Sequence, residues 1–93
     1  MAGDTAMDTG SEDGSVEIVF LGPLADMAGA DRRILAAPLD WSALLAALEP
    51  ALAQEVAKER VHVACAGKVL SDKTALAARA GDEVALLPPV SGG

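Results

Sequence analysis

Residues 81–93, GDEVALLPPVSGG, decide the fold and carry the strongest indication of function. A glycine–aspartate turn signal precedes the apolar run 83–87, which predicts a β-strand. Pro88 and Pro89 have no backbone N–H to donate to a sheet, so the strand must end where they begin. We therefore expect a final strand over 83–87, followed by an extended tail over 88–93 that leaves the sheet.

The expected tail narrows towards its end. Val90 and Ser91 follow the two prolines, and Gly92 and Gly93 come last. Glycine lets a backbone approach a bound group closely, and a terminal glycine carboxylate is the least hindered acyl centre that a chain end can offer. The shape therefore fits a tail that threads into the active site of another protein. The alternative is a frayed chain end without a function.

Upstream of this stretch, the sequence predicts four more strands and one main helix. The strands are expected over 16–21, 32–37, 61–66 and 68–70. Asp40 has the position of a helix N-cap. The apolar stripe of the helix, at i, i+3, i+4 and i+7, consists of Trp41, Leu44, Leu45 and Leu48.

Two further features complete the predicted order of elements. Pro50 either ends the helix or starts a second short helix that runs to about Lys58. A loop containing Gly29 is expected between the first two strands, and a brief helical turn over 75–80. The prediction is an α+β domain with a mixed sheet of about five strands and one main helix packed on one face.

Length and composition restrict the class of protein. The chain has 93 residues, a net charge of −7 and one cysteine. This length allows one domain, and the acidic charge argues against nucleic-acid binding. A single cysteine excludes an internal disulfide framework. Because no basic segment leads into an apolar run and no apolar stretch reaches the ~18 residues of a membrane span, we expect a cytoplasmic protein without a signal peptide or membrane contact.

The first fifteen residues differ from the rest. They contain Asp4, Asp8, Glu12 and Asp13, no basic residue and almost no bulky apolar side chain. Such a segment cannot bury enough surface to offset the entropy of ordering it. We expect a disordered acidic extension over 1–15, ahead of a folded domain over 16–87.

The chain carries little that could act as catalytic machinery. Its one histidine, His62, and its one cysteine, Cys65, lie three apart in a predicted strand, so their side chains should face opposite sides of the sheet. They cannot then form a nucleophile–base pair, and we interpret His62 as a surface residue and Cys65 as a small core residue. No phosphate-binding glycine loop, metal-ligand spacing or nucleophile elbow is present, so we expect no catalytic residue and no metal site.

Residues 16–93 resemble the small, sulfur-carrier subunit of molybdopterin synthase, within the ubiquitin-like sulfur-carrier family. The resemblance rests on VEIVFLGPLADMAGAD at 16–31, on a helix that follows a capping residue, and on a GDEV strand before PPVSGG. It does not extend to residues 1–15. It implies the β-grasp (ubiquitin-like) fold, which agrees with the order of strands and helix predicted above.

The resemblance also implies a chemistry, in which the chain carries sulfur and its partners supply the catalytic groups. The Gly93 carboxylate would be adenylated by a ubiquitin-activating-type adenylyltransferase that consumes ATP. A sulfur donor such as a rhodanese or cysteine desulfurase would then convert it to a thiocarboxylate, a C-terminal 1-thioglycine. The large synthase subunit, expected in a heterotetramer with this chain, would receive the tail and pass its sulfur to cyclic pyranopterin monophosphate. The threading residues would be Pro88, Pro89, Val90, Ser91 and Gly92, and no bound cofactor is implied.

A docking surface is implied as well. In the family an apolar patch on the sheet face near the tail contacts the partner, and Leu21, Val69 and Leu87 stand at the matching positions. Exposed apolar clusters mark interfaces, although these three side chains could instead complete the core of the monomer. Many relatives carry aromatic residues at the patch and an asparagine where this chain has Ala66 and Gly67, so its contacts would differ in detail.

Three other functions remain open at this point. The thiamine-pathway sulfur carrier shares the fold and the Gly-Gly end, but usually lacks the double proline. A ubiquitin-like modifier would use the same activation chemistry to form isopeptide bonds with lysines. A plain interaction domain would have an incidental Gly-Gly end, and deleting Gly92 and Gly93 would then change nothing.

Overall fold

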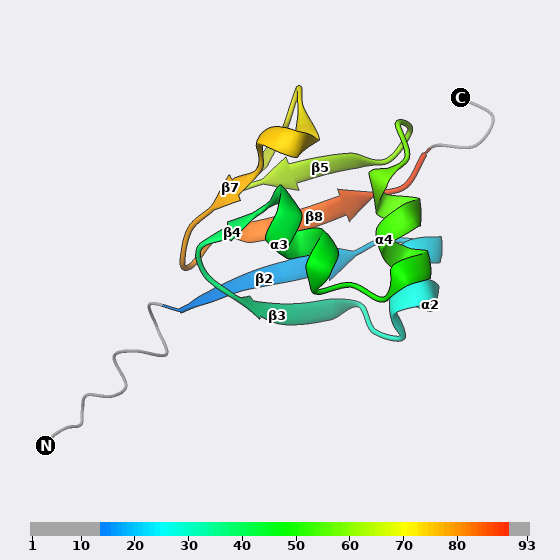
Figure 1. Cartoon of the computed structure of the whole chain (residues 1–93), viewed down its shortest axis with the longest axis horizontal. Coiled ribbons are helices and arrows are strands. Elements are labelled where there is room, and N and C mark those ends of the chain that lie inside the picture. The colour runs from blue at the N-terminus through cyan, green and yellow to red at the C-terminus, as the bar shows by residue number, and fades with distance from the viewer. Residues whose placement is uncertain (1–13, 90–93) are drawn as a thin grey trace, which may run out of the picture.

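Figure 1 shows the computed structural model, which describes residues 14–89. Most of the expected acidic extension and the tail residues from Val90 onward lie outside the described residues. Ser15, placed at the end of that extension by the sequence, already belongs to the first described strand.

Five strands form one mixed sheet in the order β3-β2-β8-β5-β6. Their bounds are β2 (Ser15–Phe20), β3 (Arg32–Ala36), β5 (His62–Cys65), β6 (Lys68–Val69) and β8 (Glu83–Leu87). The central pair, β2 and β8, is parallel, and the other neighbouring pairs are antiparallel. This confirms the predicted mixed sheet, and the last strand has the bounds expected from the turn before it and the prolines after it.

The helical part of the chain packs on one face of this sheet (Figure 1). It comprises α2 (Pro23–Ala28), α3 (Trp41–Ala46), α4 (Pro50–Ala57) and the 3-10 turn η1 (Lys73–Ala75). Asp40 caps α3 as predicted, because its Oδ1 accepts a hydrogen bond of 2.8 Å from the Ala43 N–H. Pro50 is the first residue of α4, so the predicted alternative in which a second short helix starts at this proline is correct.

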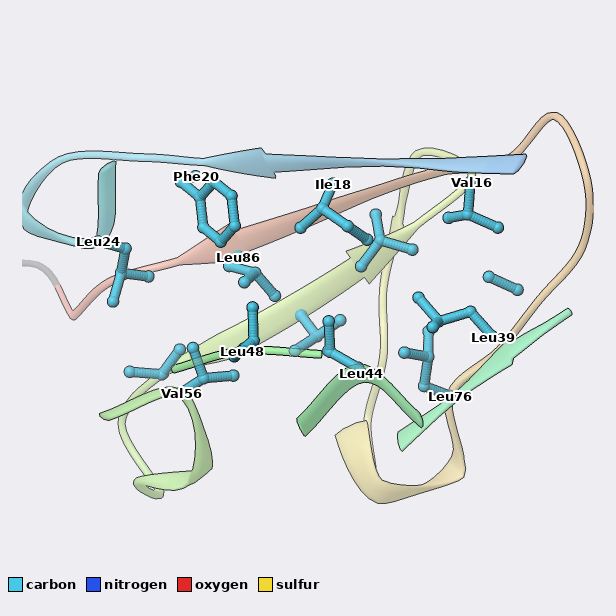
Figure 2. Close-up of a cluster of buried hydrophobic side chains, with 14 of the residues drawn as sticks. Val16, Ile18, Phe20, Leu24, Leu39, Leu44, Leu48, Val56, Leu76 and Leu86 are labelled. Carbon is cyan, nitrogen blue, oxygen red and sulfur yellow. The ribbon is translucent and has the colours of Figure 1, made fainter. Parts of the chain in front are cut away.

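The core lies between the sheet and the helices (Figure 2). In β2 the side chains of Val16, Ile18 and Phe20 are buried and alternate with half-buried ones, which is the period of a strand with one covered face. The helices contribute the buried side chains of Leu44, Leu52 and Val56, and the bend between α3 and α4 contributes Leu48. Each of these side chains contributes about 1.5–3 kcal/mol by leaving water, so they dominate the stability of so small a domain.

Two local expectations were wrong. The segment after β2, expected as a loop, forms α2, which has Pro23 in its first turn and ends at Gly29 in the left-handed conformation with φ 75°. The helical turn expected over 75–80 is displaced: η1 ends at Ala75, and β7 (Ala77–Ala78) follows, paired with β4 (Leu39–Asp40) in a small second sheet. Both segments are too short for hydrophobic periodicity to identify.

Candidate functional site: the open sheet face and the tail

The base of the tail is anchored on a central strand. The strand β8 pairs with β2 from Glu83 to Leu86 and with β5 from Val84 to Leu87, so it has a neighbour on both sides. Pro88 is half-buried and Pro89 is exposed. Because neither proline can donate a backbone hydrogen bond, sheet pairing stops there and the chain leaves from the end of a fixed strand.

Alternate residues of β8 point to opposite faces of the sheet. Val84 and Leu86 are fully buried on the helix side, while Ala85 and Leu87 are half-buried on the other side. That other side, which no described helix covers, is called the open face here (Figure 1). Leu87 therefore lies on the open face, immediately before the tail.

Apolar side chains continue across the open face. A row of backbone partners joins Val19 to Ala85, Ala85 to Ala64, and Ala64 to Val69, and partners in a sheet share a face. Leu21 follows Val19 by two residues and Leu87 follows Ala85 by two, so both extend the row towards the tail. We call this set the open-face patch: Val19, Leu21, Ala64, Val69, Ala85 and Leu87.

The structure thus brings together the three residues predicted for a partner interface. Leu21 is 40% exposed, Val69 is 60% exposed and Leu87 is half-buried. The predicted alternative, that these side chains complete the core, does not apply to Leu21 and Val69 in the isolated chain. Exposed apolar side chains gathered on one face are typical of a surface that another protein covers.

Charged residues border the patch at the end of the sheet away from the tail. Glu17 and Glu83 are backbone partners on the open face, and the Arg32 guanidinium forms an ion pair with Glu17 and lies 3.9 Å from the Glu83 carboxylate. The hydrogen bond to Glu17 raises the pKa of Arg32, with the charge of the same carboxylate acting in the same direction. The far end of the open face therefore carries these charges together with the exposed side chain of Ile34, the partner of Glu17.

Arg33 has a structural role. Its guanidinium donates to both carboxylate oxygens of Glu49 at 3.2 Å and to the backbone carbonyls of Ala47 and Ala28 at 3.2 and 3.4 Å. It also lies 5.5 Å from the centre of the Phe20 ring. These contacts tie β3 to the helical layer, so Arg33 is not available to a partner at the open face. The sequence contained no signal for them.

His62 and Cys65 lie on opposite faces, as their spacing predicted. His62 is exposed opposite Leu87, and Cys65 pairs with Val84 and packs against the core. Burial, and to a lesser extent the Asp82 carboxylate 3.9 Å away, raise the pKa of the Cys65 thiol, which favours its protonated form. Within residues 14–89, no group of three histidine, cysteine, aspartate or glutamate side chains is placed to hold a metal ion.

One hollow, lined by residues around the start of β5 and by the segment from Leu70 to Thr74, contains polar side chains, among them His62, Asp72 and Lys73. Two of these are already satisfied within the chain. The Asp72 carboxylate accepts from the Thr74 N–H and hydroxyl at 3.0 and 2.6 Å, and the Lys73 ammonium donates to three backbone carbonyls. The hollow therefore presents little unsatisfied polarity to a ligand.

A small β-grasp domain whose last strand lies at the centre of the sheet and whose sequence ends in Gly-Gly resembles the class of ubiquitin-like carriers and modifiers. The ThiS family model matches residues 18–93, and the chain is a member of the ThiS family. The predicted β-grasp fold and the relationship to ubiquitin-like sulfur carriers are therefore confirmed. A comparison with curated protein sequences gives no match.

Solved structures agree with this assignment. The crystal structure of SAMP1 from Haloferax volcanii is 31% identical with a TM-score of 0.64, over 86% of this chain and 100% of that one. One chain in the complex of subunits 1 and 2 of molybdopterin-converting factor from Helicobacter pylori 26695 is 25% identical with a TM-score of 0.59, over 85% and 99%. The small archaeal modifier protein 1 from Methanosarcina acetivorans, 21% identical with a TM-score of 0.68 over 87% and 98%, supports the fold alone.

The described part of the chain contains no helix that is long and apolar enough to cross a membrane.

Proposed function

We propose that this protein is the sulfur carrier of a molybdopterin synthase. The observation that carries the proposal is the continuity between the PPVSGG tail, the central strand β8 and the open-face patch beside it. A partner that covers the patch would receive the tail from a fixed strand end. The relative from Helicobacter pylori, which is solved together with a second subunit, supports a large synthase subunit as that partner.

The chemistry follows from the nature of a terminal carboxylate. A carboxylate is a poor acyl donor, so an activating enzyme would first join the Gly93 carboxylate to AMP from ATP and release pyrophosphate. A sulfur donor in the persulfide state would attack the acyl-adenylate and expel AMP. A second thiol of the donor system would then reduce the resulting acyl disulfide, forming a disulfide with the donor cysteine and releasing the thiocarboxylate. In the large subunit, this sulfur would go to cyclic pyranopterin monophosphate, and hydrolysis would return the carboxylate for the next cycle.

The role of the chain itself is to bind, orient and carry. The open-face patch would bind each partner in turn by burying Leu21, Val69 and Leu87, and the tail would place Gly93 in the partner's active site. Every catalytic group would belong to the partners. The acidic net charge and the scarcity of reactive side chains fit a carrier better than an independent enzyme.

A second candidate is a ubiquitin-like protein modifier, favoured by the 31% identity to SAMP1 from Haloferax volcanii. In that case the activated Gly93 would be attacked by a lysine amine, and an isopeptide bond would replace the bond to AMP. The thiamine-pathway sulfur carrier, which belongs to the same family, is the third. All three functions share the activation step and differ in the final acceptor.

Intact-mass measurement tests the shared step. The purified chain is incubated with ATP, an activating enzyme and a sulfur donor, and we expect a gain equal to the replacement of one oxygen by one sulfur. A chain lacking Gly93 is the control and should not change. If an activating enzyme that works on another carrier leaves this chain unchanged, the carrier function is rejected.

A second stage separates the acceptors. The thiocarboxylated chain is mixed with the large synthase subunit and cyclic pyranopterin monophosphate, and we expect loss of sulfur from the chain together with formation of the dithiolene product. Sulfur transfer only to a thiamine precursor, or accumulation of lysine-linked conjugates in cells, would replace the molybdopterin assignment.

A further inference from the structure

The strand β3 forms one edge of the five-stranded sheet, and no other strand of residues 14–89 pairs with its outer side (Figure 1). Two hydrogen bonds show how it pairs with β2 on its inner side. The Phe20 N–H donates to the Asp31 carbonyl at 2.8 Å, and the Ala37 N–H donates to the Gly14 carbonyl at 2.7 Å. Both bonds fall in the same antiparallel register as the rest of the pair. They therefore identify which residues of β3 turn their backbone groups towards β2.

The backbone groups of β3 alternate in direction. In an antiparallel pair, residues that exchange hydrogen bonds alternate with residues whose N–H and carbonyl groups point the other way. Arg33 and Leu35 are therefore bonded to β2, whereas the backbone groups of Arg32, Ile34 and Ala36 point outward. A row of outward-pointing donors and acceptors on an edge strand is a template for the addition of one more strand.

The two edges of the sheet differ in how well they are protected against such an addition. The other edge strand, β6, has two residues, one of which is Lys68, and short strands and lysines are common means of blocking an edge. The strand β3 has five residues in one unbroken register and contains no proline or lysine. Its Arg32 side chain forms an ion pair with Glu17 and lies 3.9 Å from the Glu83 carboxylate, so its charge is directed over the sheet and away from the outer edge.

The side chains of β3 fit a second copy of the same strand. Ile34 is 62% exposed on the open face, more than Leu21 or Val69, and it is the middle one of the three outward-pointing residues. With a two-fold axis at Ile34, the strand is its own complement, because each contact is then made twice. Ile34 would face Ile34 of the second copy, and Arg32 would face Ala36, whose small side chain leaves room for the guanidinium.

We propose that this chain forms a dimer by antiparallel pairing of β3 with β3 of a second copy, centred on Ile34. Arg32, Ile34 and Ala36 would exchange backbone hydrogen bonds with Ala36, Ile34 and Arg32 of the second copy. The two sheets become one continuous sheet with both open faces on the same side, because partners in a sheet share a face. The assembly closes as a dimer, since both β3 edges are then used and only the short β6 edges remain.

The dimer goes beyond the proposed function and does not depend on it. Self-pairing uses Ile34, which lies in the row of Glu17 and Glu83, whereas Leu21 and Leu87 lie at the opposite end of the sheet. The two β8 strands run in opposite directions across the two-fold axis, so the Leu87 residues of the two copies lie at opposite ends of the joined sheet. Self-pairing therefore leaves the apolar positions near both tails uncovered.

Sedimentation equilibrium of the full chain measures the association. A single pair of strands is a small interface, so we expect a weak dimer whose average mass rises from monomer towards dimer between about 10 μM and about 1 mM protein. Ile34→Lys places two like charges opposite each other at the centre of the pair and should weaken the association at least about tenfold. A chain that remains monomeric at about 1 mM would overturn the proposal.

Val69→Lys is the matched control. It makes the same change in charge at an apolar side chain of almost equal exposure, 60% against 62%, on the other edge strand. It should leave the association constant unchanged. Equal losses in the two variants would assign the association to net charge, and a loss in Val69→Lys alone would assign it to the open-face patch. Either result would overturn the pairing through β3.

Amide hydrogen exchange, measured by NMR on the unmodified chain, tests the register directly. As the protein concentration rises through the same range, protection should increase at the N–H groups of Arg32, Ile34 and Ala36. Protection at Arg33 and Leu35, which are already bonded to β2, should change least. This measurement needs neither a folded variant nor a partner enzyme, so it is independent of the carrier function. An increase confined to another segment, or no increase at the three outward-pointing amides, would overturn the proposal.

Discussion

Lys73 joins the end of α4 to the strand that follows it. Its ammonium donates to the carbonyls of Val56 at 3.0 Å, Lys58 and Val61 at 2.7 Å, and lies 5.7 Å from the centre of the Trp41 ring. The last carbonyls of a helix have no partner within the helix, and a cation there also complements the helix dipole. Burial lowers the pKa of Lys73, so its contacts serve structure rather than exposed chemistry.

Lys73→Met should therefore destabilise the domain. Methionine keeps the apolar stem but leaves the three carbonyls without their donor, and we expect a loss of about 2 kcal/mol in the free energy of unfolding, measured with urea. Lys58→Met is the control, since it removes an exposed ion pair with Glu55 that is worth at most about 0.5 kcal/mol. Losses of the same size in the two variants would contradict this role for Lys73.

The ion pair between Arg33 and Glu49 should affect how the free energy of unfolding depends on pH. The hydrogen bond from Arg33 lowers the pKa of the Glu49 carboxyl below its usual value. A carboxyl with a lowered pKa in the folded state contributes stability that is present above its unfolded pKa of about 4.3 and is lost as the pH falls through the folded pKa. Between roughly pH 5 and pH 3, the unfolding free energy of Glu49→Gln should therefore fall less steeply than that of the unmodified chain.

Arg33→Gln provides the check on this assignment. It leaves the Glu49 carboxyl in place but removes its donor, so it should flatten the same part of the pH dependence. The double variant should be no flatter than Glu49→Gln alone. Parallel curves for the unmodified chain and Glu49→Gln would show that this pair does not set the acid response.

At the scale of elements, the sequence predicted those whose residues repeat with a clear period or stop at a proline. The alternation in β2 and the apolar stripe of α3 were sufficient to predict these two elements. For β8, the turn signal at Gly81 and the prolines at positions 88 and 89 were sufficient to predict where the strand lies. The helix α2 was missed because, of its six residues, only Leu24 is buried, and one apolar contact has no period. The pairing of β4 with β7 was missed because two-residue strands depend on tertiary contacts.

The open-face patch shows the same division between sequence and structure. The resemblance supplied Leu21, Val69 and Leu87 as interface residues, and the structure shows Leu87 on the face opposite to the buried Leu86. The row through Val19, Ala85 and Ala64 depends on strand register, which one sequence does not fix. The contacts of Arg33 are likewise products of tertiary packing.

Two neighbouring residues of β8 have different expected roles, one in the stability of the fold and the other in binding a partner. Leu86 is fully buried in the core, whereas Leu87 faces the open side. Leu87→Asp would bring a charge into an apolar contact, so we expect affinity for the large synthase subunit to fall more than about tenfold in a calorimetric titration, with only a small effect on unfolding. Ala51→Asp adds the same charge to an exposed site on α4 and should leave the affinity unchanged. A similar loss in both variants would point to net charge rather than the patch.

At the scale of the whole molecule, the proposed function would assign stability to the folded body of residues 14–89 and reactivity to the terminal Gly93. The body holds the end of β8 between two neighbouring strands and offers an apolar face beside it, while the chain contributes no reactive side chain to the proposed transfer. Any partner that covers the open-face patch meets the tail at a fixed starting point. One surface can therefore serve several partners in turn, because each needs only a site for the terminal glycine.

This division predicts the effect of extending the chain. A few residues added after Gly93 would remove its free carboxylate and lengthen the narrow tip, without touching any contact among residues 14–89. We expect no replacement of oxygen by sulfur in the intact mass, together with an unchanged melting temperature and unchanged affinity for the partner. The same residues added before Met1 are the control and should leave sulfur incorporation intact. If a chain whose C-terminal extension is verified as uncleaved still accepts sulfur at the normal rate, the reactive group is not the Gly93 carboxylate and the carrier mechanism fails.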